Sequence, residues 1–372
     1  MFLKIDHPLL PCFIAACVYF AFLAHYLQLH DPDTFIQAGE IFTDATAIPK
    51  GLYTVSPNAG YDGQFYYRLA LSPFSTEQPS FGITLDTPRY RQQRIMYPLL
   101  SAALSFSHPP FVPYALITVN FLGLCALGYV GGRLAQSLES HALFGLLIPL
   151  FPGYLFTLAR DLTEITEAVF VALGVLYIVE KREWAAAIAL SAAVLSKETA
   201  LLVVAGIALK QVVDWRRRDR VWWAVTLLPL VVYAVWQLLL FSWWGSTPLD
   251  GGANFGIPLA GLFAGWQINA TSPIATRWLW GVVLLLLFAG MVTSQLTKSI
   301  SPRAVKIGWL VSAAMLLLLS EKVWIEDLAF ARAASLFAIL GSIVLLGGVR
   351  SIRLLTLFGM CVVWWWVASF RL

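Results

Sequence analysis

The strongest chemical signal in the sequence is a carboxylate between two glycines at the start of an aromatic segment. Residues 60–70 read GYDGQFYYRLA and place Asp62 at or near a helix N-terminus, where the helix dipole favours its ionised form. The functional interpretation is a base at the water–lipid boundary, within reach of a membrane-borne substrate. Tyr66 and Arg68 in the same segment are then candidate substrate-binding residues. The structural alternative is a helix-capping Asp62 surrounded by interfacial tyrosines.

Two further carboxylates follow the first long apolar run, in the sequence Asp31-Pro32-Asp33. Paired carboxylates at this spacing suit a divalent cation such as Mg²⁺ or Mn²⁺, or one of them can orient a partner of the other. Asp33 is therefore a second candidate catalytic residue, and such a cation is a candidate cofactor, although no metal ligand is assigned. The structural alternative is a helix-ending Pro32 with Asp33 capping the next helix.

Three arginines, Arg89, Arg91 and Arg94, form a basic cluster just before Tyr97-Pro98. Guanidinium groups suit phosphate recognition because they donate two parallel hydrogen bonds. We expect Arg94 to contact substrate. Alternatively, any two of the three arginines are solvated or in contact with lipid headgroups.

Charged residues also lie at the ends of three later apolar runs, on the same predicted side of the membrane. In the first of these, Asp161 and Glu164 are three residues apart and should share one helical face. In the last, Arg332 follows Glu326 and Asp327 and needs an anionic partner, either a carboxylate or a substrate phosphate. The structural alternative is a set of ion pairs within the membrane. The substrate-binding candidates at these ends are Glu164, Glu167, Lys197, Glu198 and Arg332.

Composition dictates the kind of element that must hold these residues. Of the 372 residues, 59% are hydrophobic and 12% are charged, and the mean hydropathy is +0.74, whereas a soluble domain has about 45–50% apolar and about 25% charged residues. This difference excludes a cytosolic enzyme, a secreted disulfide scaffold, a disordered protein and a nucleic-acid binder. Four cysteines in apolar runs are expected to be small buried hydrophobic residues; they are Cys12, Cys17, Cys125 and Cys361.

About eleven apolar runs qualify as membrane spans, since a span needs about 20 mostly apolar residues. The sequence therefore predicts an all-α, multi-pass membrane protein in which residues 1–372 form one transmembrane domain. The first run has no convincing cleavage site and should be an uncleaved anchor, and the short runs 184–196 and 199–213 should form a re-entrant hairpin. The runs are 8–29, 111–134, 141–158, 163–180, 184–196, 199–213, 221–243, 277–297, 306–320, 328–349 and 354–370.

The charges between these runs predict the orientation of the chain. With the N-terminus in the cytoplasm, 14 of the 25 basic residues lie on the inner side, in short loops such as 215–220 and 298–306, as the positive-inside rule requires. On the same scheme, 15 of the 21 acidic residues lie on the outer side. Polar chemistry is therefore expected on the non-cytoplasmic face.

Two outer loops are long enough to carry structure of their own. Residues 30–95 contain two stretches with apolar residues at helical spacing, 34–42 and 64–72, which predict amphipathic helices in the membrane interface, with a turn between them at 57–60. Residues 244–276 are rich in glycine and aromatic residues, as expected for a second interfacial element.

Residues 61–70, followed by Tyr97-Pro98-Leu99-Leu100, resemble the tryptophan-Asp and aromatic-Pro-Leu blocks of the GPI mannosyltransferase II family, within the GT-C superfamily of membrane glycosyltransferases. Tyr61 stands where that family has tryptophan, and the intervening arginine cluster is unusual. The resemblance implies a GT-C-like first outer loop of juxtamembrane helices and a polyprenyl-phosphate sugar donor. It also implies that Asp62 is the catalytic carboxylate, with Asp33 as a rival.

The predicted function is that of an inverting glycosyltransferase in which Asp62 accepts the proton of an acceptor hydroxyl. Arg94, Lys197 or Arg332 would stabilise the departing lipid phosphate. The expected partners are a polyprenyl-phosphate sugar, membrane lipid and a glycan, lipid or protein acceptor, but no nucleic acid. The active face is expected to be periplasmic, in a bacterial inner membrane rather than in the endoplasmic reticulum. The alternatives are a transporter or flippase of lipid-linked sugars, with charges strung across the bilayer, and a structural membrane subunit.

Overall fold

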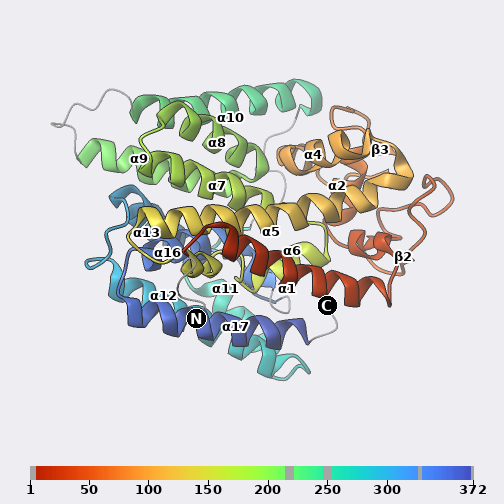
Figure 1. Cartoon of the computed structure of the whole chain (residues 1–372). Helices are drawn as coiled ribbons and strands as arrows, with labels where there is room; N and C mark the ends of the chain where they lie inside the picture. Colours follow the sequence, from red (N-terminus) through yellow and green to blue (C-terminus); the bar gives the residue numbers. More distant parts are fainter. Residues whose placement is uncertain (1–5, 214–221, 246–253, 326–328, 370–372) are drawn as a thin grey trace.

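The computed structural model describes residues 6–213, 222–245, 254–325 and 329–369. Its helices lie side by side in a bundle, and most of residues 30–110 gather at one end of it (at the right in Figure 1). That end holds the first outer loop, and the described loops rich in Lys and Arg belong to the opposite end. The predicted basic loop 215–220 lies outside the described residues, as do Glu326 and Asp327.

Five helical segments are long and apolar enough to cross a membrane, by length and composition. Their outward faces carry large exposed apolar side chains such as Phe13, Leu238 and Phe358, as contact with lipid requires. The five are α1 (Leu9–Leu27), Pro109–Ser137, which joins η3 (Pro109–Phe111) to α5 (Val112–Ser137), α10 (Trp222–Trp244), α12 (Ala275–Gln295) and α17 (Arg350–Ala368).

The prediction of eleven spans is wrong, because the other six runs form helices that are short or broken. Helices of 13–16 residues reach only about 20–24 Å at 1.5 Å per residue, less than the roughly 30 Å of bilayer hydrocarbon. Pro149 and Pro152 interrupt the run 141–158. The elements in these runs are η4 (Ala142–Leu147), α6 (Gly153–Ala159), α7 (Glu164–Val179), α8 (Glu183–Ser196), α9 (Leu201–Val213), α13 (Arg303–Leu317), α15 (Ala329–Ala333) and α16 (Ser335–Leu346).

These shorter helices are apolar because several of them form the interior of the bundle. Every residue of α16 is buried, and α9 crosses α13 so closely that a Cβ added to Gly206 would lie 2.7 Å from the Cα of Gly308. The prediction of buried cysteines is wrong for Cys17 and Cys361, which are exposed. Both lie on long outer helices, α1 and α17, where the exposed face is the one available to lipid.

The first outer loop folds over the end of the bundle. Its helix α2 (Gly63–Leu71) confirms the predicted helix 64–72, but all nine residues are buried, so α2 is no surface helix with a polar face. The predicted helix 34–42 is wrong: a 3₁₀ turn ends at Ile36, and Gln37 has φ +49°. The elements of the loop are η2 (Pro32–Ile36), β1 (Ala38–Gly39) parallel to β2 (Val55–Ser56), β3 (Pro79–Ser80) antiparallel to β4 (Ile83–Thr84), α3 (Pro88–Gln92) and α4 (Met96–Ser105).

The described part of the second outer loop packs against the segment after α13. Phe255 pairs with Leu319 in an isolated β-bridge, and Gly256 donates a backbone hydrogen bond to Leu318. Helix α11 (Ala260–Asn269) then packs against α14 (Glu321–Ile325). This arrangement places Asn254 beside the first outer loop.

Candidate active site

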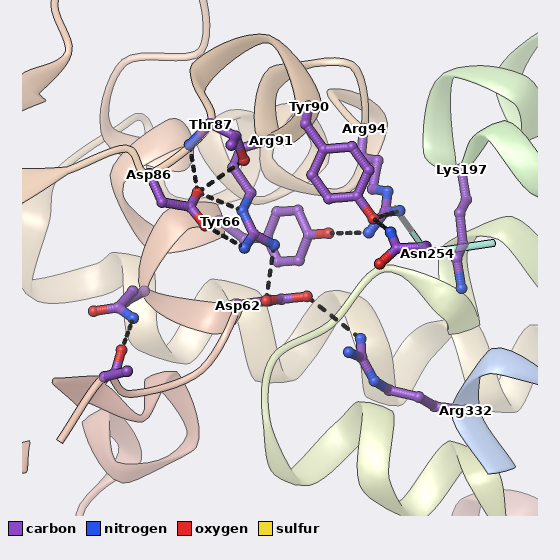
Figure 2. A network of polar contacts seen from close by, with 12 residues as sticks. Asp62, Tyr66, Asp86, Thr87, Tyr90, Arg91, Arg94, Lys197, Asn254 and Arg332 are labelled. Atoms are coloured by element: carbon purple, nitrogen blue, oxygen red, sulfur yellow. Dashed lines mark hydrogen bonds and ion pairs between the residues drawn. The ribbon is translucent and has the colours of Figure 1, made fainter. Parts of the chain in front are cut away.

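Asp62 lies directly before α2 but does not cap it. Its backbone is already helical, and its side chain makes no capping hydrogen bond. The carboxylate instead lies between two guanidinium groups, 2.8 Å from Nη1 of Arg91 and 3.4 Å from Nη1 of Arg332 (Figure 2). The arrangement favours an electrostatic role for Asp62 over the capping alternative.

Arg91 joins Asp62 to a second carboxylate on the preceding turn. Its Nε and Nη2 donate to the two oxygens of Asp86 at 2.8 and 2.7 Å, and its guanidinium lies over the ring of Phe65, 4.4 Å from the centroid. Asp86 also accepts a hydrogen bond from the backbone amide of Thr87 at 2.6 Å. Arg91 is therefore held by a carboxylate fork and an aromatic face while it reaches Asp62.

Arg94 connects the first outer loop to the turn between α8 and α9. Its Nε donates to Glu198 at 2.9 Å, and its Nη2 forms a second contact with the same carboxylate. Nη2 also donates to the hydroxyl of Tyr90 at 2.7 Å, and Nη1 lies 3.5 Å from that of Tyr66. Glu198 begins the short 3₁₀ helix η5 (Glu198–Ala200), so the predicted polar tip of this helical pair does meet the arginine cluster.

Glu164 is shared by two cations from different elements. Its Oε1 lies 2.9 Å from Nζ of Lys197 and 3.3 Å from Nη1 of Arg332, and its side chain is only 1% exposed. Arg332 comes from α15 and also lies over the ring of Tyr61, 5.0 Å from the centroid. Ion pairs among the predicted residues therefore exist, and Arg332 bridges Asp62 and Glu164.

These contacts surround a cavity of about 390 Å³. The cationic side chains exceed the carboxylates among the described residues that line it, which favours an anionic ligand. The cations are Arg91, Arg94, Lys197, Lys322 and Arg332, and the carboxylates are Asp62, Glu164 and Glu198.

The cations also determine which carboxylates are charged. Burial alone would raise the pKa of Asp62, but Arg91, Arg332 and Arg94 outweigh it and hold that pKa well below its usual range. Burial alone would also raise the pKa of Glu198, but the nearby Arg94 outweighs burial, so that this pKa is lowered. Both carboxylates are therefore ionised at neutral pH.

Four of the predicted residues lie outside the cavity lining. Arg68 is buried and donates to the carbonyl of Glu77, and Glu167 is buried against the hydroxyl of Thr199. Tyr66 is also buried and approaches the site only through the contact of its hydroxyl with Arg94. The structure therefore brings together Asp62, Arg94, Glu164, Lys197, Glu198 and Arg332.

Asp33 is the fourth predicted residue outside this lining. Its Oδ2 accepts the backbone amides of Tyr53 and Thr54, both at 2.7 Å, so the carboxylate fastens the loop rather than capping a helix. Asp31 is exposed. The expectation that Asp161 and Glu164 share a helical face is wrong, because α7 begins at Glu164 and Asp161 has φ +49°.

Two neutral residues of the site were missed by the sequence analysis. The hydroxyl of Tyr90 accepts from both Arg94 and Nδ2 of Asn254, the latter at 3.2 Å, and both residues line the cavity (Figure 2). Tyr90 stands between two of the flagged arginines. Asn254 lies in the second outer loop predicted from the sequence, but no local pattern distinguishes it from other polar loop residues.

An apolar groove of about 350 Å³ lies beside the site, between α6, α12, α15 and α17. Phe330 and Ala331 line the groove, and the next two residues, Arg332 and Ala333, line the polar cavity. One short helix thus contributes to both spaces.

Comparison with protein-family models, with curated proteins and with solved structures gave no match.

Proposed function

We propose that this protein is a membrane glycosyltransferase that transfers a sugar from a polyprenyl-phosphate donor to an acceptor hydroxyl, with inversion, on the non-cytoplasmic face. The observation that carries the proposal is the Asp62 carboxylate, which lies between Arg91 and Arg332 in a mainly cationic cavity beside the first outer loop. The resemblance of residues 61–70 to the GPI mannosyltransferase II family points to the same carboxylate.

The cations supply what a lipid-phosphate donor needs. A guanidinium group binds phosphate oxygens as it binds a carboxylate, with short charge-assisted hydrogen bonds. Arg332 is suited to this role because its contacts with Asp62 and Glu164, at 3.4 and 3.3 Å, are longer than the other ion pairs among the described residues of the cavity. Lys197 and Arg94 add positive charge within the same cavity.

The apolar groove supplies a place for the lipid. A polyprenyl chain lying along Phe330 and Ala331 would bring its phosphate to Arg332, the next residue of α15. The groove is lined almost entirely by apolar side chains from α6, α12 and α17, which suits a branched hydrocarbon chain.

In the proposed reaction, the oxygen of the acceptor hydroxyl attacks the anomeric carbon as Asp62 takes its proton. The bond between that carbon and the phosphate oxygen breaks, and the electron pair leaves with the lipid phosphate. Cations held in a partly dehydrated cavity stabilise that departing charge. The cavity carboxylates suit this scheme better than Mg²⁺ or Mn²⁺, since each is already paired with Arg or Lys, and no step is assigned to a metal.

The experiment that tests the proposal uses purified protein with a panel of polyprenyl-phosphate sugars and simple acceptors. Turnover is scored as release of the free lipid phosphate together with formation of the glycosylated product. Activity should require Asp62 and should survive Asp44→Asn, a matched change in an exposed aspartate whose side chain bonds only Thr46 among the described contacts. Movement of a lipid-linked sugar across vesicles without transfer would instead identify a flippase.

A further inference from the structure

The two oxygens of Asp62 are held in different ways. Oδ1 lies 2.8 Å from Arg91, whose guanidinium is itself fixed by two hydrogen bonds to Asp86. Oδ2 lies 3.4 Å from Arg332, whose Nη1 is shared with Glu164. One oxygen is therefore anchored by a short contact, and the other by a longer, shared one.

The Arg91 guanidinium has little freedom to turn. It contacts the rings of Phe65 and Tyr90, 4.4 and 5.4 Å from their centroids, and its side chain is 12% exposed. Asp86, which holds it, is outside the cavity lining and is fixed in turn by the backbone and hydroxyl of Thr87. The contacts from Asp86 to Arg91 and from Arg91 to Asp62 thus orient the Asp62 carboxylate from the side away from the cavity.

We infer that Arg91, held by Asp86, is the positioning residue of Asp62: it fixes Oδ1 and leaves Oδ2 to meet the acceptor hydroxyl once Arg332 turns to the donor phosphate. This inference rests on the proposed function, because it takes Asp62 as the base. The positive charge of Arg91 stabilises the ionised Asp62, and the hydrogen bonds from Arg91 to Asp86 fix its orientation. Substitutions can separate these two contributions.

The charged and titratable groups around Asp62 come from four elements. Arg91 and Arg94 lie on and just after α3, Arg332 on α15, Glu164 on α7 and Tyr66 on α2. At saturating donor the phosphate compensates Arg332, so that Arg91, the nearest cation at 2.8 Å, keeps Asp62 ionised together with Arg94.

The test measures kcat against pH at saturating donor for three variants. Arg91→Gln removes both the charge and the pair of hydrogen bonds to Asp86, and kcat should fall at least about tenfold. An acidic limb, a fall of kcat at low pH as Asp62 is protonated, should also appear near or above the ordinary Asp pKa of about 3.9. Arg91→Lys keeps the charge but not that pair of hydrogen bonds, so kcat should fall without that limb. Asp86→Asn frees Arg91 without removing its charge, and should likewise lower kcat with no limb.

Arg89→Gln is the matched control on the same helix, because Arg89 bonds Gln237 of α10 rather than Asp62. It should not introduce an acidic limb, and the folded fraction of every variant is measured by size exclusion and thermal melting. Loss of kcat that follows loss of folded protein, or an unchanged pH profile in Arg91→Gln, overturns the positioning role. Failure of the wild-type protein to transfer sugar from every donor overturns the proposed function instead.

Discussion

Asp62→Asn removes the charge and the basicity of the central carboxylate while keeping its shape. Each guanidinium that contacts Asp62 has a second carboxylate, since Arg91 keeps Asp86 and Arg332 keeps Glu164. The substitution therefore leaves no bare buried charge. We expect a loss of unfolding free energy near the lower end of the roughly 1.5–3 kcal/mol that a hydrogen bond to a charged group contributes.

The expected loss of activity is much larger. A general base contributes about 10²–10⁴-fold, which is about 2.7–5.4 kcal/mol of transition-state stabilisation at 1.36 kcal/mol per tenfold. We expect a loss near the lower end of this range, because the lowered pKa of Asp62 makes its carboxylate a weak base. The KM for the donor should stay unchanged or fall, because the variant removes a negative charge from a cavity proposed to bind a phosphate. The assay is initial-rate release of lipid phosphate per folded molecule.

Asp33→Asn is the matched comparison. Both backbone amides, of Tyr53 and Thr54, donate to the single oxygen Oδ2, which the amide oxygen of Asn can replace. The variant should therefore lose only about 1–2 kcal/mol of stability, the difference between charged and neutral hydrogen bonds, with kcat of the folded fraction near that of wild type. If Asp62→Asn stays within about tenfold of wild type while Asp33→Asn abolishes turnover, the base is Asp33. Rescue of Asp33→Asn by Mg²⁺ or Mn²⁺, with loss of wild-type activity under chelation, would assign a metal there.

Other perturbations give separate expectations. Lys197→Met should lower the free energy of unfolding, measured by thermal melting, by up to about 3 kcal/mol, because it removes a cation from buried Glu164. The double variant Lys197→Met/Glu164→Gln should lose less than the sum of the two single losses. Arg332→Lys should raise the donor KM more than it lowers stability, with Arg332→Leu worse; wild-type kinetics in both would make Arg332 purely structural. Reporter fusions should place 298–306 in the cytoplasm and 30–95 outside, and the reverse would refute the orientation. Because the pKa of Asp62 is lowered by folding, its ionised form stabilises the fold at neutral pH. Stability measured in detergent as a function of pH should lose this contribution only below the ordinary Asp pKa of about 3.9.

The charged residues of the site could be predicted from the sequence because successive apolar runs are expected to cross the bundle in alternate directions, which brings every second connection to the same end. Asp62, Glu164, Lys197 and Arg332 are far apart in sequence. Asp62 was placed in the first outer loop and the other three at the outer ends of apolar runs, and all four line one cavity. The sides assigned to these ends depend on how many times the chain crosses the membrane, so what the structure shows is the shared cavity and not the orientation.

The span count failed because hydropathy does not distinguish contact with lipid from contact with protein. Helix α16 is as apolar as a membrane span, but its 12 residues are buried among other helices. Breaks such as those around Pro149 and Pro152 turn one apolar run into two short pieces. Length, rather than mean hydropathy, separates these helices from α1 or α17.

Distinguishing Asp33 from Asp62 lay beyond the sequence for a different reason. The partners of Asp33 are backbone amides about 20 residues further along the chain, and any residue type could supply them. The types of Arg68 and Arg91 likewise do not separate their roles, but Arg68, on α2, donates to the carbonyl of Glu77, whereas Arg91 contacts Asp62. Such assignments depend on the fold of the first outer loop.

The pairing of the cavity also indicates which cation can move to a substrate. If Arg332 turned to a phosphate, Asp62 would keep Arg91 and Glu164 would keep Lys197, so neither carboxylate would be left unpaired. If Arg94 turned away instead, Glu198 would lose the only salt-bridge partner that it has within the described part of the chain. Because an unpaired buried charge is costly, exchange at Arg332 disturbs these carboxylates less than exchange at Arg94. A phosphate ligand should therefore perturb Arg332 first, and Arg94 should remain on Glu198 while the base is uncovered.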